Sequence, residues 1–238
     1  MKKLLLGAAA CIVFAAPAFA ADLPARTYTK APVYKAPEAI YNWTGFYIGG
    51  HIGGGFGGNN SLEGSNVRFL GGVQGGADYQ FSPNWVIGAE AQYSWLTGNG
   101  GGGTTFPISG TTVTGNTNEL GSVTGRLGYT WGPALLYAKG GYAWRDGVGI
   151  GASNALGPVA FATDGRHRDG YTVGGGLEYM FAPNWSGKLE YQYYNFGSTS
   201  FVTPVALAAF GSTRNDEHTV KAGINYRFNL GGPVVAKY

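Results

Sequence analysis

The sequence predicts an all-β fold, an eight-stranded antiparallel transmembrane up-and-down β-barrel. Three observations support this prediction. Apolar and polar residues alternate in eight segments of about ten residues, the length of a tilted membrane-spanning strand. Very short turns alternate with long connections rich in Gly, Ser, Thr and Asn. Tryptophans stand at the predicted strand ends, where an aromatic ring can lie at a membrane interface.

The N-terminal segment predicts export. Lys2 and Lys3 precede an apolar run, and Ala18-Phe19-Ala20 has the small-x-small pattern of a signal-peptidase site. We expect residues 1–20 to be a cleaved secretory signal peptide, which carries the single Cys of the chain. Residues 21–42 hold three prolines and no periodicity, which predicts a Pro-rich periplasmic arm.

Composition and charge narrow the function classes. The chain has 43 Gly and 15% aromatic residues, but only 12% charged residues, which is unlike an ordinary soluble domain. Without the two leader lysines, 14 basic residues face 13 acidic ones, a net charge of +1. A chain so close to neutral gives no support for nucleic-acid binding, and we expect no nucleic-acid partner.

Alternation of side chains defines the barrel, which we expect to span residues 43–228. In the first strand Phe46 and Ile48 share one face, and Tyr47 and His51 share the other. An eight-stranded barrel is just wide enough inside for side chains to fill it. Charged residues on the polar face therefore form a predicted interior charge network: Asp78, Glu90, Arg126, Lys139, Glu178, Lys188, Glu190, Lys221 and Arg227.

The same turn motif occurs in two predicted hairpins. Phe-x-Pro-Asn-Trp occurs at residues 81–85 and again at 181–185. Pro presets one turn dihedral and Asn tolerates left-handed geometry, so the chain reverses in few residues. A turn centred on Pro83 or Pro183 predicts that each Phe lies opposite its Trp. The same register places Glu178 opposite Lys188.

The strand-end aromatics predict anchors at the membrane interfaces. Trp and Tyr prefer the boundary where an apolar ring meets a wet edge. A soluble β-sandwich would also show eight alternating strands, but would not need an apolar outer face with tryptophans at its edges. The predicted anchors are Trp43, Phe81, Trp85, Trp95, Trp131, Trp144, Phe181, Trp185 and Phe228.

Four stretches together carry a family resemblance: "ADLPARTYTKAPVYKAP", "YNWTGFYIGGHIGGGFG", "VTGRLGYTWGPALLYAKGGYAW" and "HTVKAGINYRFNLGGPVVAKY". In this order they resemble the small alphaproteobacterial outer-membrane β-barrel proteins, the outer membrane immunogenic protein or porin family. The resemblance covers the mature chain apart from its loops. It implies location in the outer membrane of a Gram-negative bacterium, and a role as a surface antigen in envelope integrity and surface interaction.

The C-terminus departs from the usual barrel pattern. Barrel proteins commonly end on a Phe that the insertion machinery recognises, and Phe228 fits this pattern, but residues 229–238 follow it. Two alternatives stay open. Either Phe228 closes the barrel and 229–238 form a tail, or the segment extends the last strand and Tyr238 is the recognised aromatic.

Catalytic and metal-binding patterns are weak in this sequence. His51, His167 and His218 lie in separate segments without the spacing of a metal site, and we expect no metal and no cofactor. No His-x-Ser pair occurs. Ser200 or Ser212 could approach His218 only through the tertiary fold, so we predict that the chain is not an enzyme.

One predicted external loop carries a basic cluster, Arg166, His167 and Arg168. Guanidinium groups pair well with phosphate, so lipopolysaccharide head groups are a candidate partner. An ordinary hydrated loop is the competing interpretation. This cluster is the candidate for a ligand-binding site.

Two functions fit these observations. The first is a non-enzymatic barrel that supports the envelope and presents external loops. The second is a narrow porin that passes ions or very small solutes. The expected partners are outer-membrane lipid, lipopolysaccharide and the barrel-insertion machinery. Peptidoglycan, through Lys30 and Lys35 of the arm, and host ligands are further candidates.

Overall fold

The computed structural model describes residues 41–58, 66–97, 103–106, 110–146, 149–160, 162–163, 168–203 and 212–229. The predicted signal peptide 1–20, the arm up to residue 40 and the segment 230–238 lie outside the described residues. The alternatives for Phe228 and Tyr238 therefore stay open. Within the described ranges, no helix is long and apolar enough to cross a membrane.

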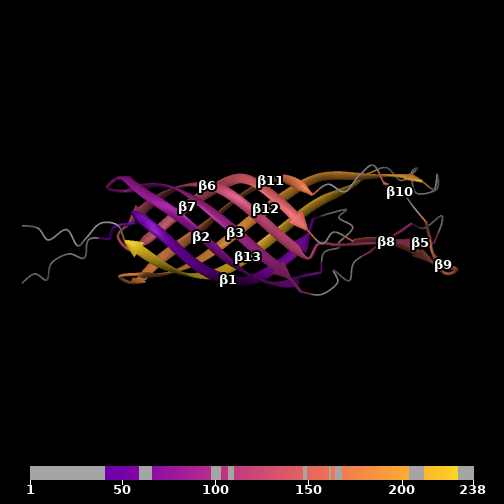
Figure 1. Cartoon of the computed structure of the whole chain (residues 1–238), viewed down its shortest axis with the longest axis horizontal. Coiled ribbons are helices and arrows are strands. Elements are labelled where there is room, and N and C mark those ends of the chain that lie inside the picture. Colours follow the sequence, from indigo (N-terminus) through magenta and orange to yellow (C-terminus); the bar gives the residue numbers. More distant parts are fainter. Residues whose placement is uncertain are drawn as a thin grey trace, which may run out of the picture. The chain divides into compact units, whose positions relative to one another are not determined.

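Eight antiparallel strands close into a barrel and run obliquely to its long axis (Figure 1). Each pairs with its neighbours in the chain, and the first also pairs with the last, so the sheet has no open edge along the barrel wall. The strands are β1 (Gly45–Gly57), β2 (Arg68–Ser82), β3 (Trp85–Leu96), β6 (Glu119–Trp131), β7 (Ala134–Asp146), β11 (Asp169–Ala182), β12 (Trp185–Thr203) and β13 (Ser212–Asn229).

The predicted alternation is confirmed along the barrel strands. In β1, Phe46, Ile48 and Ile52 are exposed, whereas Tyr47 and His51 are buried. The exposed side chains are therefore apolar and the buried side chains are largely polar. This is the reverse of the pattern in a water-soluble protein. This inversion is what a barrel surrounded by lipid requires.

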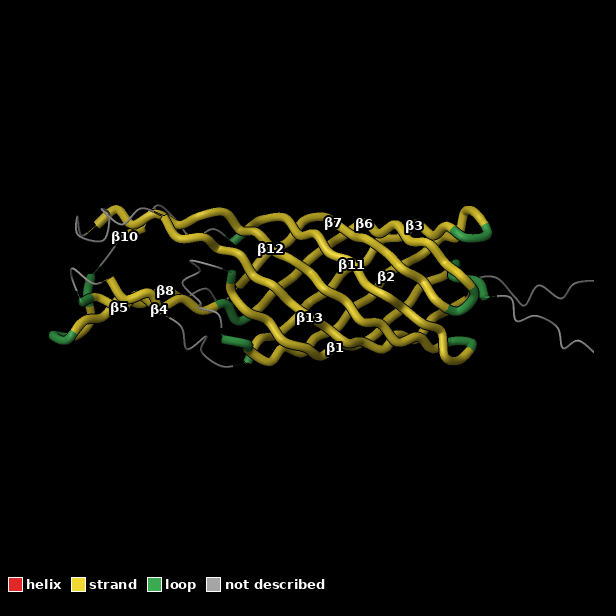
Figure 2. Tube along the Cα trace, turned by 180° about the vertical axis from the view of Figure 1, so that it is seen from behind, coloured by secondary structure: helices red, strands yellow, loops and turns green. Residues whose placement is uncertain are grey.

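The Pro-Asn turns differ from the prediction by one residue. Pro83-Asn84 and Pro183-Asn184 are two-residue turns at one end of the barrel (Figure 2). They leave Ser82 opposite Trp85 and Ala182 opposite Trp185, so the predicted Phe–Trp pairing is wrong. Each Phe is instead the extra residue of a β-bulge, which restores the predicted register further along the hairpin.

The opposite end of the barrel holds more strand than predicted. The predicted long connection between β3 and β6 contains β4 (Gly103–Phe106) and β5 (Thr111–Asn116). The predicted long connection between β7 and β11 contains β8 (Gly149–Asn154), β9 (Gly157–Pro158) and β10 (Ala162–Thr163). β4, β5, β8 and β9 form a separate four-stranded sheet, and β10 pairs with the extended β12. Gly and Thr in these segments concealed the alternation on which strand prediction depends.

Glycines on the inward side make room for large interior side chains. A Cβ added to Gly76 would lie 2.5 Å from the Tyr47 hydroxyl, and one added to Gly72 would lie 2.6 Å from His51 Nε2. Real Cβ atoms do not approach other atoms so closely. The narrow interior can therefore hold rings and long charged side chains only because the facing wall lacks side chains at these positions.

Candidate functional site in the barrel interior

All nine charged residues predicted for the interior lie there, and each is 5% exposed or less. They come from seven of the eight barrel strands, so their grouping depends on closure of the sheet. Two clusters can be distinguished by their distance from the Pro-Asn turns. We call them the turn-side cluster (Asp78, Arg126, Glu178 and Arg227) and the central cluster (Glu90, Lys139, Lys188, Glu190 and Lys221).

The turn-side cluster consists of two arginines and two acids that pair in all combinations. Arg126 contacts Asp78 and, at 3.1 Å, Glu178; Arg227 contacts Asp78 and, at 3.0 Å, Glu178. Glu178 also accepts hydrogen bonds from the Ser186 hydroxyl at 2.6 Å and the Asn225 amide at 2.9 Å. Four charges that cancel and share hydrogen bonds can remain ionised away from water.

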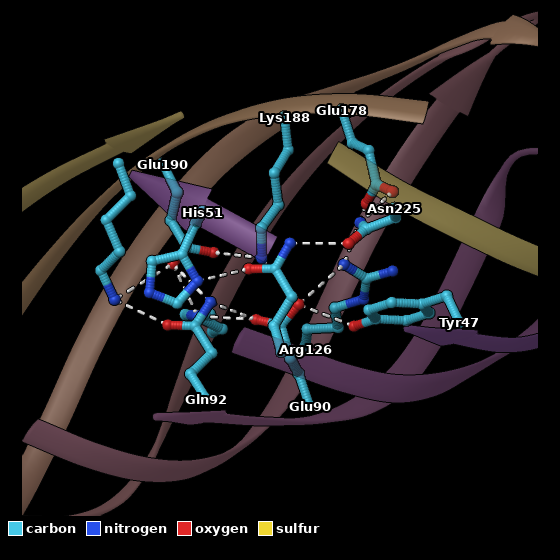
Figure 3. Close-up of polar contacts among 12 residues, drawn as sticks. Tyr47, His51, Glu90, Gln92, Arg126, Glu178, Lys188, Glu190 and Asn225 are labelled. Atoms are coloured by element: carbon cyan, nitrogen blue, oxygen red, sulfur yellow. Dashed lines mark hydrogen bonds and ion pairs between the residues drawn. The ribbon is translucent and has the colours of Figure 1, made fainter. Parts of the chain in front are cut away.

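The central cluster holds three lysines around two glutamates. Lys139 Nζ lies 2.8 Å from Glu90 and 2.9 Å from Glu190, and Lys188 Nζ lies 2.8 Å and 3.4 Å from the same two acids. Figure 3 shows Glu90 pointing toward Lys188 and Glu190 from the opposite wall. Lys221 is 3.7 Å from Glu190 and donates to Gln92 at 2.6 Å and Gln192 at 2.7 Å.

Neutral side chains complete the hydrogen bonding of the central cluster. Tyr47 donates to Glu90 at 2.8 Å and Tyr137 donates to Glu190 at 2.7 Å. His51 lies between Gln74 at 3.0 Å and Ser94 at 2.8 Å, through its two ring nitrogens. The alternation placed Tyr47 and His51 on the inward face, but their partners come from other strands and could not be derived from spacing.

The predicted hairpin register is confirmed, but it does not determine the ion pairs. Glu178 lies opposite Lys188 as expected. Yet the glutamate pairs with Arg126 and Arg227, whereas the lysine pairs with Glu90 and Glu190. Long side chains reach across the lumen to partners on distant strands. Proximity along the wall therefore did not predict the electrostatic partner.

A further layer of charge, which was not predicted from the sequence, lies toward the end opposite the turns. Arg68 pairs with Glu217 at 3.0 Å and donates to the Thr117 carbonyl at 2.6 Å. The Arg145 guanidinium lies over the Phe196 ring, 4.9 Å from its centroid. These residues lay in or beside the predicted loops. The available signal was the alternation of Arg68 with Phe69 and of Glu217 with Val220, which would have placed both charged residues on the inward face of longer strands.

Trp43 contradicts its predicted role as an interface anchor. It is completely buried at the turn side of the barrel, with the Arg227 guanidinium 4.7 Å from the centroid of its ring. Its backbone carbonyl accepts from the same guanidinium at 2.9 Å. Trp43 has the same odd-numbered parity as Tyr47 and His51, so alternation indicated an inward side chain. Its position at a strand end pointed instead to the membrane interface.

Within the described ranges, the three candidates Ser200, Ser212 and His218 do not come together as a catalytic site. Ser212 and His218 lie six residues apart on β13, about 20 Å along an extended strand, and Ser200 is the Cα partner of Ser212. His218 instead receives or donates a 2.7 Å hydrogen bond with Tyr191 and stacks on Phe56. Across the described part of the chain, no three His, Cys, Asp or Glu side chains gather as a metal site.

The match to a known protein family agrees with the closed β-barrel described above. Residues 6–228 match the model of the outer membrane protein beta-barrel domain. The chain belongs to this outer-membrane β-barrel family. Its location is therefore the outer membrane of a Gram-negative bacterium.

Individual relatives extend over nearly the whole chain. The chain is 34% identical over 250 residues to the 31 kDa outer-membrane immunogenic protein of Brucella melitensis, covering 96% of this chain and 100% of that protein. It is 30% identical to the 25 kDa outer-membrane immunogenic protein of Brucella abortus, with 96% and 99% coverage. The 22 kDa outer membrane protein of Rhizobium leguminosarum is 30% identical, with 84% and 82% coverage. The family resemblance is thus confirmed.

Solved barrels also match at low identity. Neisserial surface protein A matches with a TM-score of 0.44 and 15% identity, covering 78% of this chain and 98% of that one. OprG of Pseudomonas aeruginosa matches with a TM-score of 0.45 and 14% identity, covering 80% and 98%. The assignment of the barrel rests on the strand pairing of this chain, which closes the sheet.

In an outer-membrane barrel the short turns face the periplasm, so the Pro-Asn end is the periplasmic end. Of the nine predicted anchors, seven lie exposed on the outer wall near strand ends: Phe81, Trp85, Trp95, Trp131, Phe181, Trp185 and Phe228. Trp144 is half-buried and its ring covers Gly121, where an added Cβ would lie 2.1 Å from the indole. Only Trp43 turns inward.

The basic loop cluster is only partly described. Arg166 and His167 lie outside the described residues. Arg168 is exposed and pairs with Asp146 at 3.3 Å, with both side chains about half exposed. An exposed pair of this kind contributes little to stability. The cluster as a ligand site stays a prediction.

Proposed function

We propose that this outer-membrane barrel is a closed, non-enzymatic protein that supports the envelope and interacts with its surroundings through its extracellular strands and loops. The observation that carries the proposal is the filled interior. The side chains of Asp78, Arg126 and Glu178 in the turn-side cluster, and of Glu90, Lys139 and Lys188 in the central cluster, are each 1% exposed or less.

Side chains buried to this degree leave little room for water beside them. The central cluster bridges opposite walls, and Trp43 with Arg227 fills the periplasmic end. An ion would have to displace charges that are already paired, and leaving a buried charge unpaired is costly. The interior therefore favours a closed barrel over the alternative of a narrow porin.

Single-channel recording tests this part of the proposal. The mature chain is refolded in detergent, its folding is verified by heat-dependent gel mobility, and it is inserted into a planar bilayer beside a known porin. We expect no reproducible conductance steps from the verified barrel. Stable steps of uniform size would contradict the closed barrel and support the porin.

Complementation of a deletion strain tests the envelope role. Intact protein is compared with a variant lacking residues 200–212, a cut that spares the Arg68–Glu217 ion pair. We expect both proteins to restore detergent resistance, because both retain the barrel. We expect only the intact protein to restore binding of the cells to host ligands. Failure of intact protein to restore resistance would contradict the envelope role. Unchanged binding by the variant would exclude this hairpin as the binding element.

A further inference from the structure

The outer wall is not uniformly convex, because it carries a hollow across β13, β1 and β2. The hollow has a volume of about 1110 Å³ and its outward lining is apolar, with Ile48, Ile52, Val73, Ala222 and Ile224 around it. Gly50 and Gly71 form part of its floor, and Trp185 and Tyr226 lie at one end. We call this hollow the outer groove.

The strand register explains why the wall is hollow here. Gly50 lies between Ile48 and Ile52 along β1, and opposite Val73 on β2 and Ile224 on β13. Four branched side chains, each about half exposed, thus surround a position without a side chain. Gly71 lies opposite Ile52 and extends the floor toward β2.

The depth of the groove in the membrane follows from its place on β1. From Ile48 to Ile52 the strand rises about 13 Å, or about 10 Å along the membrane normal at the usual tilt. Its lower end shares a register row with Trp185 and Tyr226, three residues above the periplasmic start of β1 at Gly45. The interface aromatics Trp185 and Tyr226 mark the periplasmic boundary of the hydrocarbon. One leaflet contributes about 15 Å of hydrocarbon, so a groove that rises about 10 Å from this boundary lies within the periplasmic leaflet.

The periplasmic end of the groove carries polar donors suited to a lipid head. Trp185 and Tyr226 pack edge to face, with ring centroids 5.1 Å apart. Among the described residues, neither the Trp185 indole N–H nor the Tyr226 hydroxyl has a hydrogen-bond partner. Such groups at interface depth can donate to the ester or phosphate oxygens of a lipid.

We propose that the outer groove binds a glycerophospholipid of the periplasmic leaflet, with an acyl chain over Gly50 and Gly71 and the glycerol-phosphate region beside Trp185 and Tyr226. This part of the outer wall lies in the hydrocarbon of the membrane, so lipid acyl chains surround the groove and can enter it. A flexible chain conforms to a narrow floor between four branched side chains. The convex, rigid wall of a second barrel would contact the rims of the groove before its floor.

Filling the groove tests the proposal. Cβ atoms at Gly50 and Gly71 would meet their nearest neighbours at ordinary distances of 3.5 Å and 3.8 Å, so Gly50→Leu with Gly71→Leu is the variant chosen to fill the groove. Gly125→Leu on β6 is the matched control, because nothing lies within 4 Å of its Cβ on the outer wall away from the groove. Heat-dependent gel mobility confirms that each variant is folded.

Native mass spectrometry of barrels extracted from membranes in mild detergent measures the retained lipid. We expect wild type and Gly125→Leu to keep phospholipid through washing, and the double variant to keep at least about ten-fold less. Equal retention by all three would overturn the proposal. So would retention of lipid A in place of phospholipid, or a dimer that the double variant abolishes, since the occupant would then be an outer-leaflet lipid or a second copy.

A second variant tests the polar end without changing the shape of the groove. Tyr226→Phe removes one donor and keeps the edge-to-face contact with Trp185. We expect several-fold weaker retention of phospholipid, whereas Tyr129→Phe, in the similar edge-to-face pair with Trp85 outside the groove, leaves retention unchanged. Loss of equal size in both variants would contradict a specific head-group contact.

Discussion

The two faces of a single strand show that side chains on the outside and on the inside of this barrel have very different surroundings. In β13, Ile224 is 54% exposed on the outer wall, and its neighbour Asn225 is completely buried in the lumen. Outside, side chains meet lipid and each can vary without disturbing a distant strand. Inside, the charged groups of the two clusters depend on partners from other strands. Substitutions of equal size should therefore have unequal effects on the two faces.

The largest expected difference concerns a buried and a peripheral carboxylate. Glu90→Gln removes the acid that holds Lys139 and Lys188 at 2.8 Å each, and leaves buried lysines with one carboxylate. We expect a loss of about 3 to 5 kcal/mol in the free energy of unfolding. Urea unfolding of the barrel in lipid vesicles, followed by tryptophan fluorescence, measures it.

Glu119→Gln is the control for this prediction. Glu119 is half-buried on the outer side of β6 and accepts a 2.7 Å hydrogen bond from Tyr93. A glutamine oxygen can still accept that bond, so we expect a change below about 1 kcal/mol. Equal losses in the two variants would mean that the interior network contributes no more than a surface contact.

A smaller difference is expected between two adjacent glycines of β2. An alanine Cβ at Gly76 would lie 2.5 Å from both the Tyr47 hydroxyl and the Ala89 carbonyl oxygen in the interior. At Gly75, on the outer wall, the nearest atom is the Tyr47 carbonyl oxygen at an ordinary 3.5 Å.

We expect Gly76→Ala to destabilise the barrel by about 1 to 3 kcal/mol through overpacking. Gly75→Ala should be neutral or stabilising by up to about 1 kcal/mol, because it restricts the unfolded chain. The same vesicle assay compares them. A neutral Gly76→Ala would show that Tyr47 can move without loss, and that the interior is less tightly packed than its contacts indicate.

A further small effect is expected on the outer wall near the extracellular end. Tyr191→Phe removes a 2.7 Å hydrogen bond to His218 Nδ1 but keeps the ring. Because both side chains are accessible and His218 also contacts Phe56 and Tyr193, we expect a loss of about 0.5 to 1.5 kcal/mol. A loss as large as that of Glu90→Gln would contradict the distinction between the two faces.

The sequence by itself determined the strands, their direction and the inward or outward side of nearly every residue in the barrel wall. It did so because the side-chain period of a strand is two and lipid reverses the usual pattern of burial. The odd number that Trp43 shares with the inward residues of β1 also indicated that its side chain points inward. Where Gly and Thr dilute the alternation, in β4, β5, β8, β9 and β10, the same signal fails.

Only the tertiary structure decided which charges meet, that the Pro-Asn hairpins contain a bulge, and that the outer wall is hollow at Gly50. The physical reason is common to all three. Each depends on register between strands and on the reach of side chains across a closed lumen, and neither quantity is written in the spacing along one strand. The nine interior charges could be named from sequence, but their pairing arises only when β1 and β12 both meet β13.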